Sequence, residues 1–146
     1  MHNVLILWAP DTAENRRVVE AVAGAFSDLK LAPLSKKVSD AMVADVTRAD
    51  IVVFGTQKGP SDLPAEFNDC IRYFKGITLA GRTAGLFSMG SEKSTARLRK
   101  ALKDTEISQL EDDPLFNDQK TGKSAEIADW VKRLIHLHQE LHHAGA

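Results

Sequence analysis

Residues 51–55 read Ile-Val-Val-Phe-Gly, an unbroken apolar run closed by a glycine. A second apolar run, Val-Leu-Ile-Leu-Trp, occupies residues 4–8 near the start of the chain. Neither run alternates apolar with polar residues, so each predicts a strand buried on both faces, as in a parallel sheet. The two runs favour an α/β fold with helices on both faces of the sheet.

The segments around these runs alternate between helical and strand-like spacing. Apolar residues recur every three or four positions in five stretches, and these predict helices over 18–29, 38–46, 67–74, 96–103 and 125–143. Three further strands are predicted at 30–34, where Pro33 favours an edge, at 82–89, and at 107–116 as a broken strand. Strands that alternate with helices in this way predict right-handed βαβ units and one parallel sheet.

Composition limits the classes of function. The 146 residues suit one domain over 1–146, and 19 basic against 20 acidic residues leave a net charge of -1, which is not typical of a nucleic-acid-binding protein. The single Cys70 cannot form an internal disulfide, and no apolar run has the length of a membrane span. The expectation is a cytoplasmic protein with neither a membrane nor a nucleic-acid partner. A parallel sheet binds ligands beyond the carboxyl ends of its strands, so the loops at 8–15, 55–63 and 89–95 are the candidate site.

Several segments resemble short-chain flavodoxins in order and spacing. The residues that carry the resemblance are Val4 to Leu7, Ala49 to Gly55, Leu63 to Phe67, and Gly76 to Phe87. The resemblance covers residues 3 to about 141 and implies a flavodoxin-like, doubly wound five-stranded parallel sheet of order 2-1-3-4-5. It also implies a site for FMN, since flavodoxins hold FMN and pass single electrons.

The first loop departs from the flavodoxin phosphate loop, which reads roughly S/T-x-T-G-N/S-T. The corresponding stretch here is Pro-Asp-Thr-Ala-Glu-Asn at residues 10–15, where only Thr12 matches. Pro10 has no N–H to offer a phosphate, and Ala13 replaces the glycine. A carboxylate about 5 Å from a phosphate charge costs ~3 kcal/mol at an effective dielectric of ~20. We predict that Asp11 and Glu14 form a capping box instead, which fills the helix N-terminus with the chain's own anions.

The other two loops lack the aromatic residues that cover the flavin ring in the family. Lys58 stands nearest to the first missing aromatic, and the third loop keeps only its glycine, Gly90. Trp8 is predicted to pack under a neighbouring loop rather than to replace either ring.

Other chemistries have weaker support. The acidic residues of a receiver domain are missing after the first and third strands, and Cys70 lies in a helical stripe, where it is predicted to be a core thiol. His138 and His142 have the spacing of a metal pair, but no third ligand is evident, so no metal is predicted.

Two functions follow from these observations. The first is a non-redox module without catalytic residues that binds an unknown small molecule or protein and has lost tight FMN binding, so no tightly bound cofactor is expected. The alternative is an FMN-binding electron carrier with an atypical phosphate loop. In both, the resemblance places the crevice at Asp11, Thr12, Ala13, Glu14, Asn15, Thr56, Gln57, Lys58, Gly59, Met89, Gly90 and Ser91.

Overall fold

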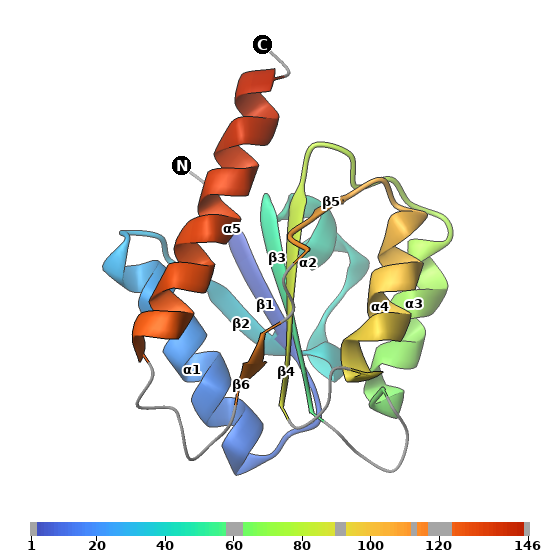
Figure 1. The fold of residues 1–146 in the computed structure, drawn as a ribbon. Coiled ribbons are helices and arrows are strands. Elements are labelled where there is room, and N and C mark those ends of the chain that lie inside the picture. The colour runs from blue at the N-terminus through green and yellow to red at the C-terminus, as the bar shows by residue number, and fades with distance from the viewer. Residues whose placement is uncertain (1–2, 58–62, 90–92, 112–113, 117–123, 145–146) are drawn as a thin grey trace.

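The computed structural model describes residues 3–57, 63–89, 93–111, 114–116 and 124–144 (Figure 1). Its strands are β1 (Val4–Trp8), β2 (Leu34–Lys37), β3 (Ile51–Gln57), β4 (Thr83–Met89), β5 (Ser108–Gln109) and β6 (Leu115–Phe116). Its helices are α1 (Ala13–Asp28), α2 (Val43–Arg48), α3 (Asn68–Phe74), α4 (Lys93–Lys103) and α5 (Ser124–Ala144), with 3-10 turns η1 (Val38–Asp40) and η2 (Ala65–Phe67).

The sheet is parallel throughout, with the strand order β2-β1-β3-β4-β5. This order confirms the predicted doubly wound topology. The chain moves outward from β1 to β2 on one side and returns to β3 on the other, so the order reverses at β1 and β3. Such a reversal opens a crevice outside the carboxyl ends of the strands.

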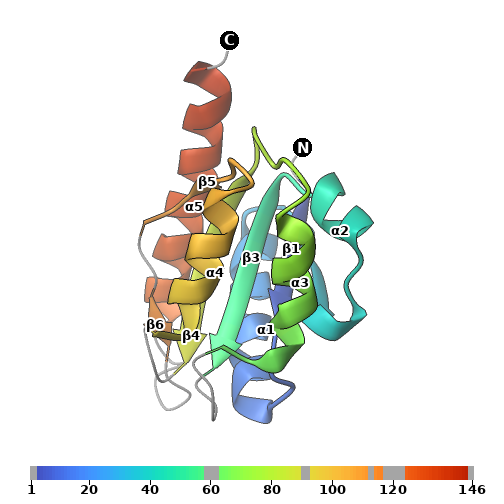
Figure 2. The ribbon, with the colours of Figure 1, turned by 90° about the vertical axis from the view of Figure 1, so that its right-hand side faces the viewer.

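Helices cover both faces of the sheet. α1 and α5 lie on one face, while α2, α3 and α4 lie on the other (Figures 1 and 2). Neighbouring residues of a strand point to opposite faces of the sheet. Ile6 and Val53 pack with α1 and α5 on one face. Leu7 and Phe54 pack with the helices on the other face. All four side chains are fully buried, which explains why β1 and β3 are apolar without alternation.

The second strand begins later than predicted. Residues 30–34 were expected to form it, but after α1 the Leu31 amide still donates to the Phe26 carbonyl at 3.1 Å, and Lys30 adopts a positive φ of 65°. This turn at the helix end occupies the predicted strand. β2 therefore begins at Leu34, where pairing with Leu5 of β1 becomes possible.

The predicted helix over 38–46 is also wrong in part, because a 3-10 turn and α2 replace it. Val38 and Val46 are buried as predicted, but Met42 lies between the two elements and is 68% exposed. The Met42 amide donates to the Asp45 carboxylate at 2.9 Å, which starts α2 immediately afterwards.

The described part of 107–116 contains two short strands, which agrees with the predicted broken strand. β5 pairs with the start of β4 at Thr83 and Ala84, and β6 pairs with its end at Ser88 and Met89. The last helix, α5, packs on β4 and projects beyond the other elements at its C-terminal end (Figure 1). No helix within the described residues is both long and apolar enough to cross a membrane.

Candidate functional site

The candidate site lies where β1, β3 and β4 end, at the edge from which α1 begins. Trp8 pairs with Gly55, and Gln57 pairs with Met89, so the ends of the three strands are adjacent. Of the predicted site residues, Lys58, Gly59, Gly90 and Ser91 lie outside the described residues. The described part of the site is therefore the loop before α1 together with the ends of β3 and β4.

Thr12, and not Asp11, caps α1. The Thr12 hydroxyl accepts a hydrogen bond from the Asn15 amide at 3.1 Å, and the Thr12 backbone has the extended conformation of an N-cap. The predicted capping box of Asp11 and Glu14 is therefore wrong by one residue. The reason is that the Thr12 amide turns back to the Pro10 carbonyl at 3.0 Å, which places Asp11 outside the helix.

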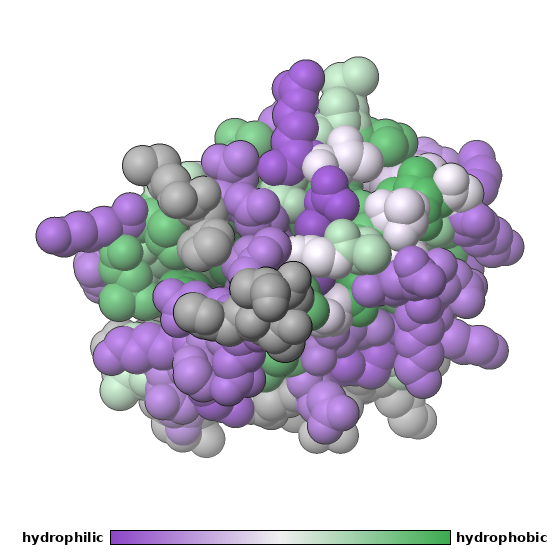
Figure 3. All heavy atoms as spheres, turned by 90° about the horizontal axis from the view of Figure 1, so that it is seen from above, coloured by the Kyte–Doolittle hydropathy of each residue, from purple (hydrophilic) through white to green (hydrophobic). Residues whose placement is uncertain are grey.

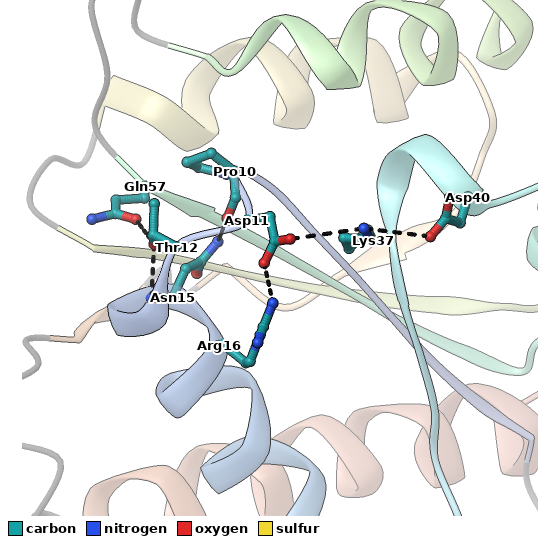
Figure 4. A network of polar contacts seen from close by, with 8 residues as sticks. All are labelled: Pro10, Asp11, Thr12, Asn15, Arg16, Lys37, Asp40 and Gln57. Carbon is teal, nitrogen blue, oxygen red and sulfur yellow. Dashed lines mark hydrogen bonds and ion pairs between the residues drawn. The ribbon is translucent and has the colours of Figure 1, made fainter.

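Asp11 forms ion pairs away from the helix. Its carboxylate lies 2.5 Å from Arg16 Nη2 and 3.7 Å from Lys37 Nζ, and Lys37 is 3.9 Å from Asp40 (Figure 4). These groups are largely exposed, so the pairs contribute little to stability. They do neutralise Asp11, because two cations lie within 4 Å of it. Lys37 and Asp40 were not predicted, since only the pairing of Trp8 with Lys37 brings β2 next to this loop.

Gln57 joins the end of β3 to the start of α1. Thr12 Oγ1 donates to Gln57 Oε1 at 2.5 Å (Figure 4), and Gln57 Nε2 donates to Glu14 Oε2 at 3.0 Å. The structure therefore brings together three of the predicted site residues, Thr12, Glu14 and Gln57.

Asn15 lies under the loop and is fully buried. Its Nδ2 donates to the Pro10 carbonyl at 3.0 Å (Figure 4). Its Oδ1 has no hydrogen-bond partner among the described residues. A buried acceptor without a donor is costly, and a water molecule or a ligand hydroxyl would satisfy it.

The first amides of α1 have no hydrogen-bond acceptor among the described residues. The first intrahelical bond runs from the Arg16 amide to the Thr12 carbonyl at 2.9 Å, so the amides of Ala13 and Glu14 have no acceptor within the helix. Ala13 has a helical backbone, and the only described non-glycine residues with positive φ are Lys30 and Glu106. The loss of the family's glycine therefore causes no backbone strain at this position.

The remaining described residues of the site are less accessible. Thr56 is fully buried and its hydroxyl donates to the Phe87 carbonyl at 3.4 Å, and Met89 is buried at the end of β4. Trp8 was expected to pack under a neighbouring loop, but it is 7% exposed and packs in the core with residues of α1 and α5. Its ring is therefore largely covered by the protein.

Other reactive groups lie away from this edge. Burial raises the pKa of the Cys70 thiol to about 11, and Tyr73 Oη lies 3.0 Å from its Sγ, as befits a core thiol. His138 is buried with Nδ1 2.8 Å from Thr83 Oγ1. Within the described residues, no group of three or more His, Cys, Asp or Glu side chains could hold a metal ion.

Two hollows lie toward the opposite end of the molecule, where hydrophilic residues cover most of the face and apolar patches lie between them (Figure 3). One, of about 210 Å³, lies beside the start of β1 at Asn3 and Leu34. The other, of about 550 Å³, lies between Leu29 and α5 at Ile135. Neither borders the candidate site.

Comparison with solved structures places these features in a known architecture. A short-chain flavodoxin associated with a non-canonical PDU bacterial microcompartment matches with a TM-score of 0.79 and 16% identity, over 94% of this chain and 99% of its own. Flavodoxin 2 of Bacillus cereus matches with a TM-score of 0.79 and 12% identity, over 92% and 98% of the two chains. A Fusobacterium nucleatum flavodoxin bound to flavin mononucleotide matches with a TM-score of 0.76 and 11% identity, over 93% and 98%.

No protein-family model and no curated protein sequence matches the chain. The structural matches extend over nearly its full length and include the strand order described above. The chain has the flavodoxin-like fold.

Proposed function

We propose that this protein binds FMN at the ends of β1, β3 and β4 and serves as an electron carrier. The observation that carries the proposal is the capping of α1 by Thr12, which leaves the amides of Ala13 and Glu14 without a bond to any carboxylate of the described residues. A helix N-terminus with free amides suits a phosphate, because the N–H groups and the helix dipole both favour negative charge.

The non-redox module was predicted because Asp11 and Glu14 were expected to form a capping box at the N-terminus of α1, where the phosphate of FMN would bind. We call this place the phosphate seat. Asp11 is instead turned toward Arg16 and Lys37, which neutralise it. Electrostatic exclusion of phosphate therefore rests on Glu14 alone among the described acids of the loop. This difference favours FMN binding over its loss.

The residues of the loop have distinct roles in this proposal. The amides of Ala13 and Glu14 would donate to phosphate oxygens, and the Thr12 hydroxyl would donate a third bond after release from Gln57. Asn15 Oδ1, which is buried and has no partner among the described residues, would accept a hydrogen bond from a hydroxyl. FMN, when bound, supplies the one-electron redox chemistry. The chain's own residues hold its phosphate end.

The non-redox binding module remains the second candidate, and one observation favours it. Gln57 is hydrogen-bonded to both Thr12 and Glu14, so a ligand that uses these two side chains must displace two hydrogen bonds. Such a bridge suits a crevice that holds no phosphate.

A titration with FMN separates the two candidates. Purified protein is freed of bound ligand and titrated with FMN, while quenching of flavin fluorescence and the visible absorbance bands are followed. FMN binding predicts saturable quenching with a submicromolar dissociation constant and a reversible reduction of the bound flavin. Absence of quenching at FMN concentrations well above micromolar would retire the electron-carrier proposal and leave the binding module.

A further inference from the structure

The orientation of the Gln57 amide is determined by its neighbours. Thr12 Oγ1 already accepts the Asn15 amide at 3.1 Å, so the hydroxyl hydrogen is free to donate to Gln57 Oε1 at 2.5 Å. With its oxygen occupied in this way, Gln57 presents Nε2 to Glu14 at 3.0 Å. The three side chains form one ordered chain of donors and acceptors that holds the Glu14 carboxylate beside the first turn of α1.

Glu14 differs from Asp11 in whether a cationic side chain pairs with it. Asp11 has Arg16 and Lys37 within 4 Å, whereas no lysine or arginine of the described chain forms an ion pair with Glu14. Among the described residues, its side chain accepts a hydrogen bond from the neutral amide of Gln57. No described cation therefore pairs with the Glu14 carboxylate, which lies next to the amides that would hold a phosphate.

We propose that Glu14, held in place by Gln57, cancels the advantage in affinity that a phosphate dianion would otherwise have at the N-terminus of α1. This inference rests on the proposed function, because it concerns which flavin the crevice takes. A carboxylate repels the phosphate of FMN but accepts hydrogen bonds from the hydroxyls of a ribityl chain. Asn15 Oδ1 adds a second acceptor that a hydroxyl satisfies and a dianion does not. The seat accordingly accepts riboflavin about as well as FMN.

The test compares FMN with riboflavin on matched variants. Apoprotein is titrated with each flavin by fluorescence quenching at low and at high ionic strength, for the unaltered chain, Glu14→Gln, Gln57→Ala and Glu20→Gln. Glu20→Gln is the control, since Glu20 is an exposed acid of the same helix about 9 Å farther along its axis. Circular dichroism confirms that each variant is folded.

We expect Glu14→Gln to raise the affinity for FMN without a comparable rise in the affinity for riboflavin. The unaltered chain binds the two flavins with affinities within about threefold, and Glu14→Gln tightens FMN about tenfold at low salt while riboflavin changes by less than about twofold. Gln57→Ala raises the ratio of FMN affinity to riboflavin affinity by a smaller factor, since it releases Glu14 toward solvent. High salt reduces the gain in FMN affinity of both variants. Glu20→Gln leaves the ratio of FMN affinity to riboflavin affinity unchanged.

Three results overturn the inference. If Glu14→Gln does not change the ratio of FMN affinity to riboflavin affinity, Glu14 does not determine which flavin is preferred. FMN binding then still supports the proposed function. An equal gain from Glu20→Gln assigns the effect to net charge rather than to the seat. If neither flavin binds to any folded variant, the proposed function fails and the inference fails with it.

Discussion

The indole of Trp130 on α5 lies against Gly85 in the middle of β4, with no room for a side chain between them. A Cβ built on Gly85 would lie 2.9 Å from Trp130 Cζ2 and 3.0 Å from Leu134 Cδ2. The strand interior therefore contains a glycine because α5 approaches it closely, although glycine ordinarily weakens a strand. The same indole makes an edge-to-face contact with Phe87, with ring centroids 6.3 Å apart.

The substitution Gly85→Ala is expected to destabilise the protein by about 1–3 kcal/mol, because a methyl group must displace Trp130 and Leu134 from a packed core. Chemical denaturation measures the change. Gly24→Ala is the matched control: Gly24 lies in α1 and has open space around its Cβ position, so alanine should stabilise by about 0.5–1 kcal/mol. Equal effects of the two substitutions would contradict the close approach.

The cap at Thr12 provides a second prediction. Thr12→Ala should cost about 1 kcal/mol of unfolding free energy, because the Asn15 amide loses its acceptor. Thr12→Ser keeps the hydroxyl and should remain within about 0.5 kcal/mol of the unaltered chain. Thermal and urea unfolding measure both values. A loss from serine as large as that from alanine would point to the methyl group rather than to the cap.

The buried thiol predicts a loss of stability at alkaline pH. Desolvation raises the pKa of Cys70 from 9.0 to about 11, so the unfolded chain releases this proton before the folded chain does. Its contribution to stability is complete below pH 9 and is lost as pH rises from 9 toward 11. Between about pH 8.5 and pH 10 we expect the free energy of unfolding to fall by ~1 kcal/mol from this group.

Cys70→Ser is the control for this pH dependence, since serine does not titrate in that range and retains a partner for Tyr73. Urea unfolding across the same pH range should give a shallower fall for the variant. Part of the fall remains, because burial also raises the pKa of Tyr73. Identical pH profiles for the two proteins would contradict the assignment to Cys70.

The Asp45 carboxylate predicts a loss of stability in acid. Its hydrogen bond from the Met42 amide is the main cause that lowers its pKa below the ordinary 3.8, and Lys36 at 3.0 Å adds to it. The contribution is therefore present above pH 3.8 and disappears as pH falls through the folded-state pKa.

Asp45→Asn should accordingly lower the unfolding midpoint in urea at neutral pH, and the difference from the unaltered chain should shrink in acid. Asp28→Asn, at an exposed acid at the end of α1, should show no such convergence. If Asp45→Asn lowers the urea midpoint by the same amount at neutral and at acidic pH, the loss of stability comes from packing rather than from charge.

The main elements of the fold could be predicted because their signals are local. The apolar runs of β1 and β3 and the helical stripe from Phe67 to Phe74 lie within single segments, and burial on both faces of a parallel sheet requires that composition. Prediction failed for β2, because the turn that ends α1 uses hydrogen bonds from Leu31 to Phe26 that periodicity does not reveal.

At the candidate site, sequence spacing identified the loop but misplaced its cap. Asp11 and Thr12 are both good capping residues, and the spacing from Asp11 to Glu14 satisfies the capping-box pattern. The choice depended on where the chain leaves β1 and on the arrival of Gln57 beside Thr12.

The sequence by itself determined a parallel sheet covered by helices on both faces, because hydrophobic burial acts on every residue of a strand and leaves its pattern in the chain. Only the tertiary structure decided the charge of the site. Lys37 and Gln57 reach the loop from β2 and β3 through the register of parallel strands. Lys37 joins the nearby Arg16 in neutralising Asp11, and Gln57 holds Glu14. Such partners are distant in the chain, so no local pattern records them.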